Sequence, residues 1–117
     1  MIEAPLQDRL RAALTAAMKA SDSTAIAALR SALSAIGNAE AVDGAPVHSG
    51  DSPFAGAVSG LGAGDVPRRQ LTEHDVAAVV LAEVDERLAV ATEYDALGSA
   101  ETAARLRAEA AVLAQLL

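Results

Sequence analysis

The sequence predicts an all-α protein: two antiparallel helical hairpins that form a small four-helix bundle, with a long Gly/Pro-rich loop between the hairpins. Composition is the first observation. Hydrophobic residues make up 52% of the 117 residues and aromatic residues only 2%, so the core must be aliphatic. The chain is also rich in alanine, the residue with the highest helix propensity. Periodicity is the second, since apolar residues recur three and four positions apart in four segments. Spacing is the third. The first and second helical segments are joined by a short connection, and so are the third and fourth, and short connections favour antiparallel packing of the helices they join.

The first hairpin is expected over residues 5–20 and 23–42. Pro5 is favoured at the start of a helix. Ser21, Asp22 and Ser23 interrupt the periodicity and supply side-chain oxygens that can cap the next helix. The apolar face of the first helix comprises Leu6, Leu10, Ala13, Leu14, Ala17 and Met18, and that of the second comprises Ile26, Leu29, Leu33 and Ile36.

The second hairpin is expected over residues 72–97 and 99–116. Thr72 stands three residues before Asp75, the spacing of a capping box. Gly98 is expected to end the first of these helices, and Ser99 can cap the second. The last helix has one apolar face, made of Ala103, Leu106, Ala110, Leu113 and Leu117.

Between the hairpins, residues 43–70 hold most of the glycine and proline of the chain and show neither a helical nor a strand period. We expect a linker that adds little to the core of a single domain spanning residues 1–117. An alternative is a docking peptide around Phe54, with Val58 and Leu61 nearby. No Lys-Ser or Lys-Thr follows the glycines, so a phosphate-binding loop is not expected.

Charge and cysteine content limit the function. The net charge is −7, and in residues 71–117 three arginines stand against nine acidic residues. Phosphate backbones are bound by surplus Lys and Arg, so direct binding of nucleic acid, tRNA included, is not favoured. No cysteine is present, which removes thiol nucleophiles and sulfur-ligated zinc. Without a signal peptide or an apolar run long enough to span a membrane, the protein is expected to be cytoplasmic.

No catalytic, cofactor-binding or metal-binding residues are expected. The serines lie at helix ends and in the 43–70 stretch without a paired base, and a catalytic serine needs an activating base. His48 and His74 do not share a helical face with further ligands. The pattern therefore predicts a protein that is not an enzyme and needs no cofactor.

One charged group interrupts an apolar face. The apolar arc of the third predicted helix comprises Val76, Val80, Val84, Ala91 and Tyr94. Glu83 and Arg87 fall within this arc, four residues apart in the order that favours an ion pair. An unpaired charge there would cost several kcal/mol. Arg30 could join Glu83, and Glu109 could meet Arg87, which gives a candidate ion-pair network of four residues. The network either fixes the register of the helices or lines a polar groove for a ligand.

Short motifs occur in order along both predicted hairpins. In the first they are Ala17-Met18-Lys19, Leu29-Arg30, and Ala35-Ile36 with Asn38 and Glu40. In the second they are Leu71-Thr72, Glu83-Val84 with Arg87, Tyr94, Gly98, and Glu109 with Leu113. In this order and spacing the motifs resemble the YqeY family, with residues 43–70 as an insertion. The family usually has Phe at the position of Tyr94.

The resemblance implies a function in translation. The YqeY family is related to the tail region of GatB, a subunit of the amidotransferase that forms Gln-tRNA and Asn-tRNA. It thus implies association with glutamine-dependent carbon–nitrogen ligase activity and with tRNA. Family members usually continue into a further small helical domain, likened to a tRNA-binding tail, and we expect a chain that ends at Leu117 to lack it. Three functions follow: a non-catalytic module for a protein partner, which we favour, a tRNA-binding accessory protein, or an amidating enzyme.

Overall fold

The computed structural model describes residues 3–42 and 70–117 and contains only α-helices in these ranges. The helices are α1 (Leu6–Ala20), α2 (Ser23–Val42), α5 (Glu73–Ala96) and α6 (Ala100–Ala114). They differ by no more than two residues at any end from the predicted segments. Apart from Gln70, the predicted linker lies outside the described residues, as do its Phe54 alternative and His48.

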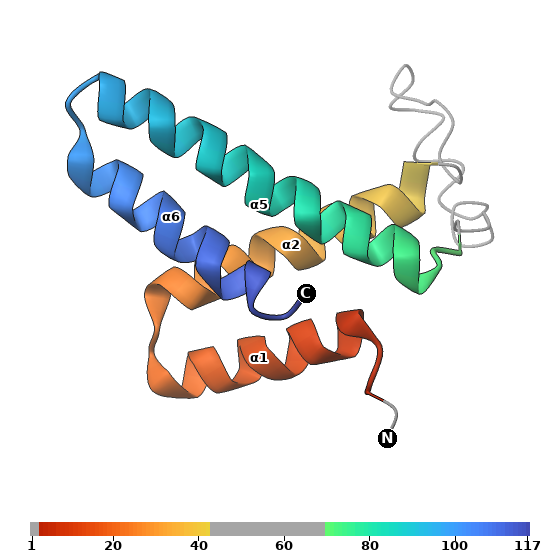
Figure 1. Cartoon of the computed structure of the whole chain (residues 1–117). Coiled ribbons are helices and arrows are strands. Elements are labelled where there is room, and N and C mark those ends of the chain that lie inside the picture. Colours follow the sequence, from red (N-terminus) through yellow and green to blue (C-terminus); the bar gives the residue numbers. More distant parts are fainter. Residues whose placement is uncertain (1–2, 43–69) are drawn as a thin grey trace, which may run out of the picture.

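The four helices form two hairpins that pack against each other (Figure 1). α1 packs against α2, and α5 packs against α6 along their length. α2 also contacts both α5 and α6, whereas α1 reaches only α5 in the second hairpin. The tip of the α5–α6 hairpin projects away from α1 and α2 (Figure 1). α2 is therefore the helix that joins the two hairpins into one small bundle, as the sequence predicts.

The connection between α1 and α2 is a tight turn. Ser21 follows α1 with a positive φ of 54°. The carboxylate of Asp22 then accepts a hydrogen bond from the backbone N–H of Ala25 at 3.1 Å. This bond satisfies one of the N–H groups that the first turn of a helix leaves unpaired. The predicted capping by this polar segment is confirmed at Asp22.

Helix α5 starts with the predicted capping box. The hydroxyl of Thr72 accepts from the N–H of Asp75, and the Asp75 carboxylate accepts from the N–H of Thr72, each at 3.0 Å. At the other end Gly98 has a φ of +81°, a conformation that glycine adopts at low cost. The side chain of Ser99 makes no capping hydrogen bond to α6. That part of the prediction was wrong, because the φ of −97° and ψ of 68° at Ser99 are not those of a usual cap residue.

The N-terminus of α1 is capped by a residue of another helix. The backbone N–H of Leu6 donates to the carboxylate of Glu73, the first residue of α5, at 2.6 Å. Arg9 adds a second tie, since its guanidinium donates to the carbonyl oxygen of Leu116 at 2.7 Å. The start of α1 is thus fastened to the start of α5 and to the segment after α6. Sequence reasoning missed both bonds, because they join residues 67 and 107 positions apart.

The core consists of aliphatic side chains from all four helices. No polar or charged residue among those described is fully buried. The largest fully buried side chains are Leu10, Leu29, Ile36, Val80 and Leu113. At about 25 cal/mol per Å² of buried apolar surface, burial of these side chains dominates the stability of the bundle.

The buried face of α2 is rotated relative to the predicted stripe. Leu29 and Ile36 are fully buried as predicted, whereas Ile26 and Leu33 are only partly buried. The other buried positions are the alanines Ala25, Ala28 and Ala32. Because the distance between packed helices depends on the side chains at the contact, small side chains let α2 approach its neighbours closely. The rotation decides which polar residues of α2 face α5.

Three residues of the predicted apolar faces are exposed: Met18 at 49%, Tyr94 at 36% and Leu117 at 51%. Each lies near the end of its element, Met18 close to the end of α1, Tyr94 close to the tip of the α5–α6 hairpin and Leu117 at the C-terminus. Periodicity extends a face to the end of a helix, but burial stops where the neighbouring helix stops.

Candidate functional site

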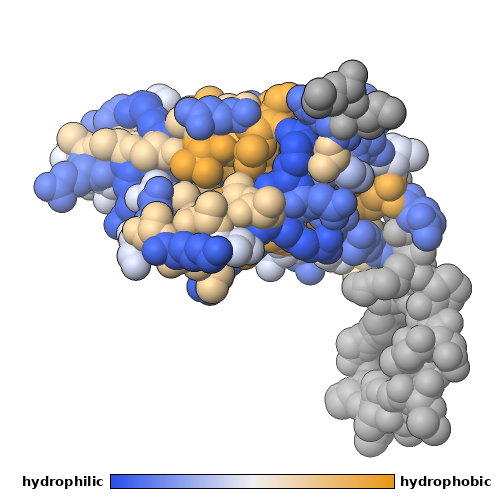
Figure 2. Space-filling model, turned by 90° about the horizontal axis from the view of Figure 1, so that it is seen from below, coloured by the Kyte–Doolittle hydropathy of each residue, from blue (hydrophilic) through white to orange (hydrophobic). Residues whose placement is uncertain are grey.

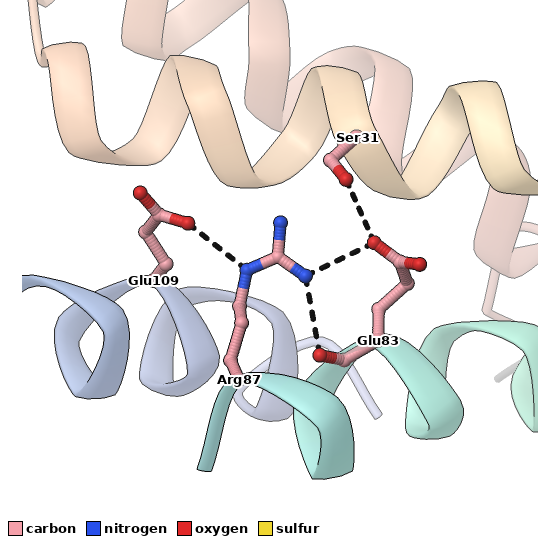
Figure 3. Close-up of polar contacts among 4 residues, drawn as sticks. All are labelled: Ser31, Glu83, Arg87 and Glu109. Atoms are coloured by element: carbon pink, nitrogen blue, oxygen red, sulfur yellow. Dashed lines mark hydrogen bonds and ion pairs between the residues drawn. The ribbon is translucent and has the colours of Figure 1, made fainter. Parts of the chain in front are cut away.

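Three of the four candidate residues meet where α2, α5 and α6 come together (Figure 3). The Arg87 side chain donates from Nε to the Glu109 carboxylate of α6 at 3.0 Å. From a terminal nitrogen it donates to the Glu83 carboxylate at 3.0 Å and to the Glu83 carbonyl oxygen at 3.1 Å. The exposed fractions of the three side chains are 12% for Arg87, 18% for Glu83 and 13% for Glu109. The network is therefore largely buried, and its charges are paired.

The fourth candidate, Arg30, does not belong to the network. It is exposed on α2, and Ser31 takes the place predicted for it by donating from its hydroxyl to Glu83 at 2.7 Å. The rotated alanine face explains the correction. At about 100° per residue, Arg30 lies about 140° from the centre of that face, whereas Ser31 lies about 120° away on the opposite flank. The run of alanines was the signal in the sequence that pointed to Ser31.

The electrostatics of the network hold Arg87 in its charged form. Burial lowers the pKa of Arg87, but the hydrogen bonds that Arg87 donates to Glu83 and Glu109, together with the negative charges of these residues, raise it more. The pKa of Arg87 therefore lies above its ordinary value. The positive charge of Arg87 stabilises the fold fully at pH values below the pKa of Arg87 in the unfolded chain, and this stabilisation is lost as pH rises through the pKa of Arg87 in the folded chain. Both pKa values lie far above neutral pH, so this contribution to stability is constant through neutral pH.

An open groove of about 260 Å³ borders the network. Besides Ser31 and the three charged residues, its walls are formed by Glu86, Val90 and Leu106. Arg87 is bonded to Glu83 and Glu109 rather than left with an unpaired charge. One guanidinium is shared by two carboxylates on two helices, and buried polar groups can specify helix register. The arrangement suits a structural tie between α2, α5 and α6.

The described residues offer no other polar centre of this kind. His74 is exposed in the first turn of α5. Within residues 3–42 and 70–117, no three side chains of the His, Cys, Asp and Glu types are grouped so that they could hold a metal ion. None of the helices in these ranges combines the length and the apolar character that crossing a membrane requires.

Apolar side chains also reach the surface. Figure 2 shows one face of the molecule on which hydrophobic residues gather in an area bordered by hydrophilic ones. Two large apolar residues are exposed in the middle of a helix rather than near the end of one, namely Leu81 at 49% and Leu88 at 43%, both on α5. The sequence analysis did not single out either leucine.

Comparisons with known proteins found no match: no family model fits the chain, and neither the curated proteins nor the solved structures include a similar one. The fold places the chain in the class of small all-α bundles. The resemblance to the YqeY family stays a prediction.

Proposed function

We propose that this protein is a non-catalytic, cytoplasmic helical module that binds a protein partner. The observation that carries the proposal is the state of the buried polar network. Arg87 is paired with Glu83 and with Glu109, each at 3.0 Å, so the three residues hold α5 and α6 together. A catalytic acid or base instead needs reach to a substrate and a suitable proton affinity.

The exposed apolar residues of α5 support binding as the function. A non-catalytic module acts through its surface, and Leu81 and Leu88 are nearly half exposed in the middle of a helix. The acidic character of residues 71–117 favours a basic protein surface over a phosphate backbone. The resemblance to YqeY proteins directs the search for the partner to the tRNA-dependent amidotransferase and the translation machinery.

The test has three measurements on the full chain. The immobilised protein is used to capture binders from lysate, and the purified binder is then titrated against the chain. We expect saturable binding with a defined stoichiometry. Mobility-shift titration with total tRNA at physiological ionic strength should show no selective complex, because nonspecific phosphate contacts weaken steeply with salt. Incubation with glutamine should release no ammonia.

Two results would overturn the proposal. Sub-micromolar, tRNA-selective binding at physiological salt would establish the alternative, an accessory protein that acts on tRNA directly. Glutamine turnover that is lost on substitution of one defined residue would establish an amidating enzyme. Arg30→Ala is a useful control in both assays, because Arg30 is exposed and lies outside the network.

A further inference from the structure

Helix α5 exposes large apolar residues beside its buried side. Its inner side is buried in the core through Val76, Val80, Val84 and Ala91. Leu81 and Leu88 lie roughly 75–95° around the helix from the centre of that side and are exposed. α1, by contrast, has its buried residues on one face and carries polar residues on the other. Large apolar side chains that are exposed in the middle of a helix are candidate contacts for a binding partner.

The outer face of α5 is defined by seven exposed residues: Ala78, Leu81, Ala82, Asp85, Leu88, Ala89 and Thr92. Leu81, Asp85 and Leu88 follow one another at i, i+4 and i+7, the spacing of residues on one side of a helix. Asp85 is the single charge on this face. The alanines leave room for a second helix to approach closely.

A second copy of this chain is a poor occupant for the outer face. Symmetric pairing of two copies presents the same patch from both sides. Because Asp85 lies between Leu81 and Leu88, pairing centred on the leucines brings two Asp85 carboxylates together in either helix direction. Like charges juxtaposed in an interface cost several kcal/mol. The flanking Glu86 and Glu93 are also exposed and would add to the repulsion.

A basic helix complements the same features. Asp85, Glu86 and Glu93 are exposed, and their side chains make no ion pair or hydrogen bond with another residue in the described ranges. We propose that the outer face of α5 binds an amphipathic helix of the partner, with apolar residues seven apart and Lys or Arg between them. The apolar residues pack beside Leu81 and Leu88, and the basic residue meets Asp85. This proposal rests on the proposed function and names the chemistry of its partner.

The test uses a synthetic peptide as the probe. It is helical, about 21 residues or three heptads long, with Leu at seven-residue spacing and Lys or Arg at the flanking positions. A matched peptide carries Glu at the basic positions. Each peptide is labelled and titrated by fluorescence anisotropy against the full chain at low and at physiological salt. We expect saturable binding of the basic peptide that weakens with salt, and no binding of the acidic peptide.

Variants locate the site. Leu81→Ser/Leu88→Ser should weaken binding roughly tenfold or more, because apolar anchors carry most of the energy of such contacts. Asp85→Lys should weaken binding of the basic peptide and create binding of the acidic one. Met18→Ser is the matched control, because Met18 has the same exposed fraction as Leu81, 49%, on another helix. Circular dichroism checks that each variant keeps its helix content.

Three outcomes would overturn the proposal. Equal binding of the peptide by the wild type and by Leu81→Ser/Leu88→Ser would show that the face is not used. Equal binding of both peptides would remove the role of Asp85. A wild-type dimer in sedimentation that dissociates on Leu88→Ser would make the face a self-interface. If a captured partner binds the double variant as tightly as the wild type, this site is wrong while the proposed function stands.

Discussion

Replacing Arg87 with alanine tests the network most directly. The substitution removes three hydrogen bonds of 3.0–3.1 Å and leaves two carboxylates, Glu83 and Glu109, facing each other with 18% and 13% of their side chains exposed. Removing one partner of a buried ion pair costs about 3–5 kcal/mol. Because both carboxylates retain some access to water, we expect the lower end of that range, about 3 kcal/mol.

The measurement is chemical denaturation of the wild type and of Arg87→Ala, with thermal melts beside it. A loss of about 3 kcal/mol lowers the melting temperature of a domain of this size by roughly 10–15 °C. Arg107→Ala is the matched control in the same hairpin. Arg107 pairs with Asp95 at 2.6 Å, but both side chains are 45% exposed, so its removal should cost less than about 1 kcal/mol.

A third variant separates charge from packing. Arg87→Met, combined with Glu83→Gln and Glu109→Gln, removes all three charges while keeping most of the volume. It should recover most of the stability lost in Arg87→Ala, because no uncompensated charge remains. An Arg87→Ala protein as stable as the wild type would refute the reasoning that these charges are buried and mutually dependent.

Three further substitutions test a helix cap and two glycine positions. Glu73→Gln should cost about 1 kcal/mol in denaturation, because the carboxylate that caps α1 at 2.6 Å becomes a weaker neutral acceptor; an unchanged midpoint would argue against the cap. Gly98→Ala should cost about 1 kcal/mol, since the φ of +81° disfavours a side chain although a Cβ there meets no atom within 4 Å. Gly37→Ala should instead stabilise by about 0.5–1 kcal/mol, because Gly37 lies inside α2 and a Cβ there also has free space. Equal shifts at the two glycines would contradict the conformational argument.

The candidate site shows which side-chain contacts could be predicted from the sequence and which could not. Glu83 and Arg87 lie on one helix, so their pairing follows from the helical period alone. Glu109 requires α6 to pack antiparallel to α5, which the short connection at Gly98 makes predictable. The partner on α2 depends on the rotation of that helix. The prediction followed the large apolar residues of α2 and gave little importance to its alanines. Because the alanines are buried, α2 is rotated so that Ser31, and not Arg30, contacts Glu83.

The sequence by itself determined the class of this protein. Alanine-rich periodic segments, the capping box at Thr72 and the glycine at position 98 act within a few residues of themselves. Local geometry is therefore enough to define the helices and their pairing into hairpins. The tertiary structure alone decided how the hairpins meet: which face of α2 is buried, that Glu73 caps α1, and that Leu81 and Leu88 are left exposed. These features depend on close packing between residues far apart in the chain, where the fit of whole helix surfaces outweighs the preference of any one residue.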